Sequence, residues 1–211
     1  MRLTAAAVTP PAAWRRIDKN LGIMLPWGFG TFIERWLEKA NNYSDTDLSD
    51  VFDKFFTLFV AFGAIYQEIY QLMLEEGRFG SRRYSEEDAA VKSLSEYLGY
   101  SELAKPLRIH AEQIMYIESL IEKETFYFCV QKDHRTPDYD ADRELLSDLR
   151  SDQDEIFCQA ILKLLYRTRC NMFHGAKEYS EQQMGLINSM NIFLKSVVDV
   201  AMKKLDIAGS G

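Results

Sequence analysis

The chain has 211 residues, of which 47% are hydrophobic, so it holds enough apolar material for one sizeable globular domain. Its formal net charge of -7 argues against strong nucleic-acid binding through overall charge, although a local basic patch remains compatible with RNA. The three cysteines include no Cys-X-X-Cys pair, so neither a disulfide framework nor a zinc site is indicated.

The sequence shows neither a secretory signal nor a membrane span. Residues 1–13 contain one arginine and several alanines but no long apolar core. The most apolar stretch, 55–66, is too short to cross a bilayer. We therefore expect a cytoplasmic protein without membrane contact.

Residues 1–47 are predicted to contain an extended arm and two short helical segments. A proline-containing arm over 1–13 precedes a short helical turn at 14–20. A break rich in proline and glycine then leads to a short helix over 31–41.

The strongest helical pattern of the chain runs over 48–76. Aromatic and aliphatic side chains recur there at intervals of three and four residues, which places them on one broad helix face. The members of this face are Phe52, Phe55, Phe56, Phe59, Phe62, Tyr66, Ile69, Tyr70 and Met73. The segment is predicted to be one of two central helices of a bundle.

Two further helices are predicted between residues 77 and 130. The first covers 86–98 and ends at Gly99, a residue type that commonly terminates helices. The second is predicted as one long helix over 101–130, with His110 on or beside its apolar face.

Residues 138–142 resemble the opening of a calcium-binding loop. The pattern fails because Arg143 stands where glycine is required and Leu149 stands where glutamate is required. The sequence therefore predicts a solvated acidic turn at the start of a helix, and no metal site.

The second central helix is predicted over 152–170 and the last helix over 180–205. Both have apolar residues at helical spacing, and no segment of the chain alternates as a strand does. The predicted fold class is all-α, a helical bundle with antiparallel neighbours.

Charge gathers where the helix over 152–170 ends. Between Gln159 and the lysine at 177 there is no acidic residue, and the basic residues are Lys163, Arg167, Arg169 and Lys177. Arg169 continues the helix face of Leu165, and an arginine on a core-facing stripe is unfavourable unless something pairs with it. This stretch is therefore a candidate anion site.

His174 follows five residues after Arg169, with Asn171 between them. Histidine exchanges protons near neutral pH, and arginine grips phosphate oxygens at two points. Together they are suited to phosphoryl transfer. A structural alternative is a helix end where both side chains meet terminal carbonyls. Of the other histidines, His134 is expected to be solvated and His110 to pack.

Residues 169–175 resemble the HEPN superfamily, all-α proteins marked by an arginine, four to six residues, and a histidine. Here the gap is four, and the polar residue Asn171 is displaced by one position from its usual place. The segment 59–68 is similar to the early aromatic helix of several HEPN families. The resemblance makes 1–211 a single domain with its core at 48–76 and 152–205. By the same resemblance, 1–47 is an N-terminal extension and 77–150 is a helical insertion.

The resemblance implies a metal-independent RNA endonuclease that needs no cofactor and acts as a homodimer. Arg169, His174 and Asn171 would be catalytic. Because of their charge in the same basic stretch, Arg167 and Lys177 are expected to bind the RNA substrate. Such proteins are commonly toxins or anti-phage defence effectors, so an antitoxin or a defence-system partner is implied as well.

A second function class stays open. A non-catalytic HEPN-like assembly module would use the same residues to hold RNA, a nucleotide or a partner protein. The intact pair of Arg169 and His174 favours the enzyme, whereas the acidic net charge and the displaced Asn171 favour the module.

Overall fold

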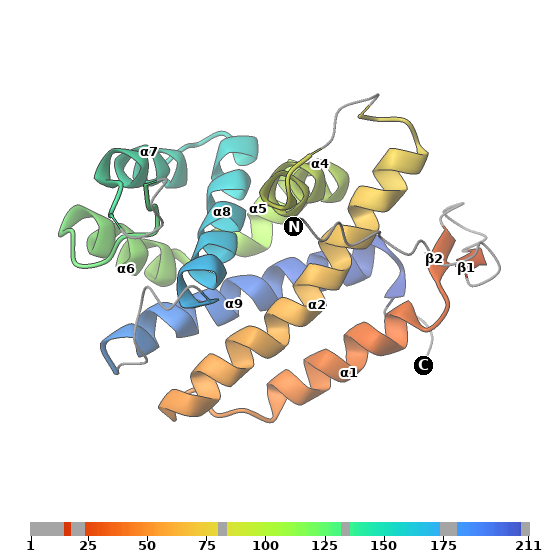
Figure 1. Ribbon diagram of the computed structural model, residues 1–211, viewed down its shortest axis with the longest axis horizontal. Helices are drawn as coiled ribbons and strands as arrows, with labels where there is room; N and C mark the ends of the chain where they lie inside the picture. The colour runs from red at the N-terminus through yellow and green to blue at the C-terminus, as the bar shows by residue number, and fades with distance from the viewer. Residues whose placement is uncertain (1–14, 18–23, 80–83, 132–135, 174–180, 208–211) are drawn as a thin grey trace, which may run out of the picture.

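A computed structural model describes residues 15–17, 24–79, 84–131, 136–173 and 181–207. Nearly all regular structure in these ranges is helical, which confirms the predicted all-α fold (Figure 1). None of the described helices is both long and apolar enough to cross a membrane. The helices are α1 (Phe29–Asn41), α2 (Leu48–Glu75), α3 (Glu86–Asp88), a π-helical segment (Ala89–Ser93), α4 (Leu94–Leu98), α5 (Tyr100–Arg108), α6 (Ala111–Glu122), α7 (Tyr139–Leu149), α8 (Asp154–Phe173) and α9 (Glu181–Lys204).

A small hairpin precedes the helices. β1 (Arg15–Ile17) pairs antiparallel with β2 (Met24–Pro26), so the helical turn predicted at 14–20 is wrong over the three residues of β1. One isolated helical turn is unstable because it fixes several residues for a single hydrogen bond. Pairing with β2 gives the same backbone groups partners on another strand.

α2 begins at a side-chain cap and carries the aromatic centre of the core. The Asp47 carboxylate accepts a hydrogen bond from the Asp50 backbone N–H at 3.0 Å, which satisfies an otherwise unpaired group of the first turn. Phe62 is buried, and its ring centroid lies 5.2 Å from those of Phe59 and Tyr66. These edge-to-face contacts stack the stripe along the helix.

The central helix pair differs from the predicted one. α2 packs most extensively against α9 and is flanked by α1, whereas α8 packs mainly on α5, α7 and the π-helical segment (Figure 1). Leu94 of α4 and Leu103 of α5 are fully buried in the common core. The helices of 77–150 therefore complete the interior around α8.

The single long helix predicted over 101–130 is wrong. It divides into α5 and α6, and α6 ends at Glu122, so the described residues between 123 and 131 are not helical. Pro106 lies inside α5 and supplies no backbone N–H, and α5 ends two residues later. His110 stands at the break, where its Nε2 lies 3.0 Å from the Ser196 hydroxyl of α9, so it has the packing role expected of it.

The acidic turn before α7 is only partly solvated. Asp138 caps α7 by accepting a hydrogen bond from the Ala141 N–H, as a helix start requires. Asp142, however, is 2% exposed and accepts hydrogen bonds from the backbone N–H groups of Phe128 and Cys129. Burial raises the pKa of Asp142, and these hydrogen bonds oppose that rise. The prediction of a solvated turn is therefore wrong for Asp142.

Cysteine reactivity should follow burial. Cys129 and Cys158 are buried, and burial raises the pKa of each thiol to about 12, whereas Cys170 is half-buried. Because the thiolate is the reactive form, we expect iodoacetamide at pH 8 to alkylate Cys170 first, with the other two roughly 10³-fold slower. Mass spectrometry of the native protein measures the order, and unfolding in urea should equalise the rates. Native labelling of Cys129 at the rate of Cys170 would contradict the described core.

Candidate functional site

Arg169 lies near the C-terminal end of α8, half-buried against α2. It prolongs the face of Leu165, which is fully buried, so the sequence-based placement of this arginine is confirmed. Its guanidinium carbon lies 5.7 Å from the ring centroid of Phe59, within the range of a cation–π contact. This aromatic face offsets part of the loss of hydration at the end of an apolar stripe.

Tyr66 and Tyr166 lie within the electrostatic influence of Arg169, and Glu86 interacts with both tyrosines. The Tyr66 hydroxyl is buried and donates a hydrogen bond to Glu86 Oε1 at 2.8 Å. Burial raises the pKa of Tyr66 and of Tyr166, with Glu86 adding to both shifts and the charge of Arg169 opposing them. Both phenols are therefore neutral at physiological pH, and Arg169 and Glu86 carry opposite charges beside them.

The sequence analysis missed Tyr66, Glu86 and Tyr166 as members of this site. One signal was present, because Tyr66 is the first side chain with a polar tip in a stripe that begins with five phenylalanines. A buried tyrosine hydroxyl usually needs a hydrogen-bond partner. The partner, Glu86, is twenty residues away on another helix, and no local pattern points to it.

Asn171 has a structural contact in this arrangement. Its side chain is 5% exposed, and its Nδ2 donates a hydrogen bond to the Phe128 backbone carbonyl at 3.0 Å. This contact ties α8 to the chain segment that also binds Asp142. A catalytic role for Asn171 stays a prediction, and its amide nitrogen is already engaged.

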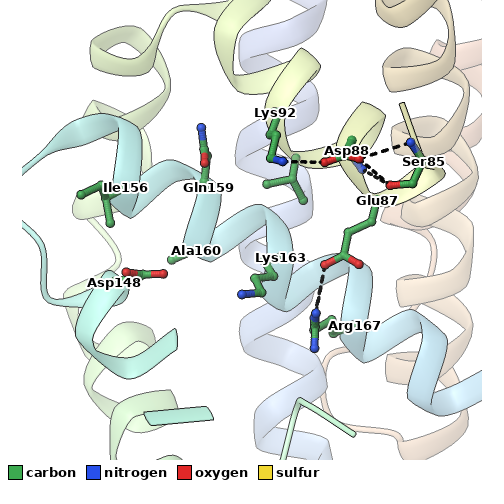
Figure 2. A pocket seen from close by; sticks show the side chains of 11 residues that line it. Ser85, Glu87, Asp88, Lys92, Asp148, Ile156, Gln159, Ala160, Lys163 and Arg167 are labelled. Carbon is green, nitrogen blue, oxygen red and sulfur yellow. Dashed lines mark hydrogen bonds and ion pairs between the residues drawn. The ribbon is translucent and has the colours of Figure 1, made fainter. Parts of the chain in front are cut away.

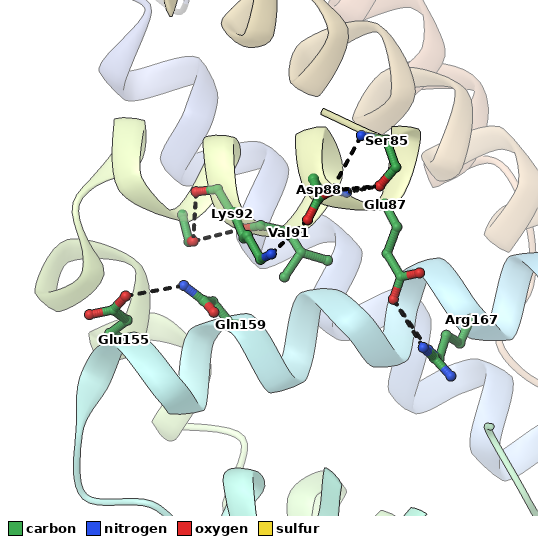
Figure 3. Close-up of polar contacts among 9 residues, drawn as sticks. Ser85, Glu87, Asp88, Val91, Lys92, Glu155, Gln159 and Arg167 are labelled. Carbon is green, nitrogen blue, oxygen red and sulfur yellow. Dashed lines mark hydrogen bonds and ion pairs between the residues drawn. The ribbon is translucent and has the colours of Figure 1, made fainter. Parts of the chain in front are cut away.

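Arg167 faces away from Arg169. Residues two apart on an α-helix point roughly 200° apart, so the two guanidinium groups lie on different faces of α8. Arg167 contacts Glu87 of α3, with its Nη2 3.2 Å from Glu87 Oε1 (Figure 3). The predicted grouping of Arg167 with Arg169 around one substrate is therefore not what the structure describes.

Arg167 instead lines a pocket of about 540 Å³ between α8, α7 and the helix formed by α3 and the π-helical segment (Figure 2). We call it the α8 pocket. Its other lining residues are Ser85, Glu87, Asp88, Val91, Lys92, Asp148, Ile156, Gln159, Ala160 and Lys163.

His174 and Lys177 lie outside the described residues. α8 extends to Phe173, so His174 is the next residue of the chain after that helix. Among the described residues, no group of three or more His, Cys, Asp or Glu side chains is arranged to hold a metal ion.

Replacing Arg167 by alanine should reduce stability more than RNA affinity. The side chain is 27% exposed and is paired with Glu87, so its loss should lower the free energy of unfolding by about 1 kcal/mol in urea titrations. A double-mutant cycle with Glu87→Ala isolates the pair, because each single change removes the same contact. A large loss of RNA affinity at unchanged stability would instead restore Arg167 to the substrate site.

No protein-family model matches the chain, and no curated protein or solved structure matches it. The site is therefore defined by its own chemistry. It joins a guanidinium over an aromatic ring, two neutral phenols and a carboxylate, with His174 next in the chain after α8.

Proposed function

We propose that the protein is a metal-independent RNA endonuclease of the HEPN type, acting in the cytoplasm as a toxin or an anti-phage defence effector. One observation carries the proposal. The guanidinium of Arg169 is half-buried over the Phe59 ring at the end of the helix that leads directly into His174. A cation fixed by packing stabilises developing charge without having to reorganise during the reaction.

The proposed reaction is an attack of a ribose 2′-hydroxyl on the adjacent phosphorus. His174 accepts the proton of the 2′-hydroxyl, and Arg169 stabilises the charge on the pentavalent phosphorus. The bond from phosphorus to the 5′-oxygen breaks, and that oxygen takes a proton from solvent water, to which His174 returns the proton it accepted. The products are a 2′,3′-cyclic phosphate and a 5′-hydroxyl end.

The proposal includes a homodimer with the Arg169 sites of both subunits in one cleft. A two-fold interface brings equal surfaces together, so the two cationic ends of α8 would lie close to each other. An RNA phosphate between them would relieve their repulsion. A partner that restrains the enzyme, such as an antitoxin or another component of a defence system, belongs to the same proposal.

A non-catalytic RNA-binding or assembly module is the second candidate. The observation that favours it is the engagement of Asn171, whose amide holds the backbone of Phe128. Because that amide is occupied, Arg169 and His174 are the two residues left for RNA cleavage among those that the HEPN resemblance implies. Such a module would bind RNA and leave it intact.

The two candidates separate in one assay. Purified protein should cleave single-stranded RNA in EDTA and leave 2′,3′-cyclic phosphate ends, detected by mass spectrometry of the fragments. The same RNA carrying 2′-O-methyl groups should bind but stay intact, because the attacking hydroxyl is blocked. Binding of both RNAs with cleavage of neither would reject the nuclease and support the module.

A further inference from the structure

The α8 pocket is a second candidate binding site, separate from Arg169. Its volume of about 540 Å³ lies within the roughly 300–1,000 Å³ of small-molecule sites and far exceeds the space that one ion requires. It opens on the face of α8 that carries Lys163 and Arg167, which are one helical turn apart (Figure 2). Arg169 points away from it.

Part of the charge in the α8 pocket is neutralised within the protein. Lys92 Nζ lies 2.7 Å from Asp88 Oδ1, and the Ser85 hydroxyl donates to the same carboxyl group at 2.8 Å (Figure 3). Ser85 and Asp88 also form a reciprocal capping box at the start of α3. These three side chains therefore form a hydrogen-bonded wall of the pocket.

Lys163 and Asp148 remain as opposite charges on facing helices. Within the described part of the chain, neither side chain forms an ion pair, and no contact joins them across the pocket (Figure 2). Two uncompensated charges of opposite sign at one cavity fit a ligand that has an anionic group at one end and hydrogen-bond donors at the other.

The π-helical segment supports a functional role for this pocket. Residues 89–93 wind more widely than an α-helix, and Val91 and Lys92 of this segment line the pocket. Such π-helical insertions are rare, and they occur frequently at functional sites.

We propose that the α8 pocket binds a mononucleotide or a closely similar phosphate monoester. The phosphate lies between Lys163 and Arg167, whose two positive charges match a dianion and whose guanidinium offers a two-point grip. Arg167 is held by Glu87 in the structure, so the proposal requires the phosphate to displace this carboxylate, which is 38% exposed and can turn to solvent. Sugar hydroxyl or base amino groups donate to Asp148, and Val91, Ile156 and Ala160 provide the apolar wall.

Calorimetric titration with AMP at low ionic strength tests this site without any assay of RNA cleavage. Wild-type protein should bind one AMP per chain, and Lys163→Gln should weaken binding roughly tenfold or more because a charge-assisted contact is lost. The matched control is Lys195→Gln, an exposed lysine of α9 paired with Asp199, which should leave AMP affinity unchanged. If both variants lost the same AMP affinity, the proposal would be overturned, since AMP would then be attracted by the overall positive charge and not by this pocket.

Related ligands assign the two ends of the pocket. Adenosine, which lacks the phosphate, should bind much more weakly than AMP. Asp148→Asn should weaken the binding of AMP and leave the weak binding of inorganic phosphate unchanged. If wild-type protein fails to bind AMP at millimolar concentration, or binds inorganic phosphate as tightly as AMP, the mononucleotide site is refuted. Because AMP binding should survive in Arg169→Lys, this site and the nuclease stand or fall independently.

Discussion

Arg169→Lys is expected to lower the rate of RNA cleavage roughly 10²–10³-fold, the range typical for removal of one transition-state donor. Lysine keeps the positive charge but loses the planar, two-point hydrogen-bonding geometry. It also loses the flat face that packs over the Phe59 ring, with the guanidinium carbon 5.7 Å from the ring centroid. Single-turnover cleavage of a labelled RNA measures the effect.

The matched control for this change is Arg150→Lys. Arg150 is exposed on the surface, where it pairs with Glu118 and Glu122, so the same substitution there should leave cleavage unchanged. Thermal melting followed by circular dichroism should show that both variants fold. If Arg169→Lys cleaved RNA at the wild-type rate, the planar two-point contact of this arginine would play no part in the reaction.

Asp142→Ala is expected to be the most destabilising single change among the polar residues of the core. It would leave the buried backbone N–H groups of Phe128 and Cys129 without their acceptor, at a cost of about 3 kcal/mol in the free energy of unfolding. Asp140→Ala serves as the control, because Asp140 is 87% exposed and its loss should change stability by less than about 0.5 kcal/mol. Urea titration measures both, and equal stabilities would contradict the described role of Asp142.

The pH dependence of this effect has a defined sign. Burial raises the pKa of Asp142 in the folded state. The favourable contribution of this pKa shift to the free energy of unfolding is therefore fully present below the pKa that Asp142 has in the unfolded chain. That contribution is lost as the pH rises through the folded-state pKa. The stability of the wild type relative to Asp142→Asn should therefore increase as the pH falls from neutral. If this relative stability instead increased as the pH rises, the hydrogen bonds from Phe128 and Cys129 would outweigh burial in setting the pKa of Asp142.

Local periodicity was sufficient to predict the main helices. The aromatic stripe of α2 and the glycine after α4 are short-range signals. α2 has nearly the predicted bounds, and the helix predicted over 86–98 is present as α3, the π-helical segment and α4 in succession. The break between α5 and α6 was missed because apolar residues on its two sides continue one helical pattern. Pro106 lies inside α5, two residues before that helix ends, and it indicates the break only when the start of α5 is already known.

Long-range partners could not be predicted in the same way. Arg167 meets Glu87 from eighty residues away, and Asn171 meets the Phe128 carbonyl from forty-three residues away. Both contacts depend on how α8 is packed, which no local pattern specifies. The sequence therefore located a cationic helix end, but it could not show which residues of other segments Arg167 and Asn171 contact.

The central claim is that Arg169 and His174 cleave RNA together, and His174→Ala tests it most directly. Wild-type and variant proteins are compared on the same single-stranded RNA in EDTA, with folding checked by circular dichroism. The account predicts a rate about 10²–10⁴-fold lower in the variant, because proton transfer to His174 is lost. Cleavage by His174→Ala at the wild-type rate would contradict the nuclease and leave RNA binding or assembly as the function of this site.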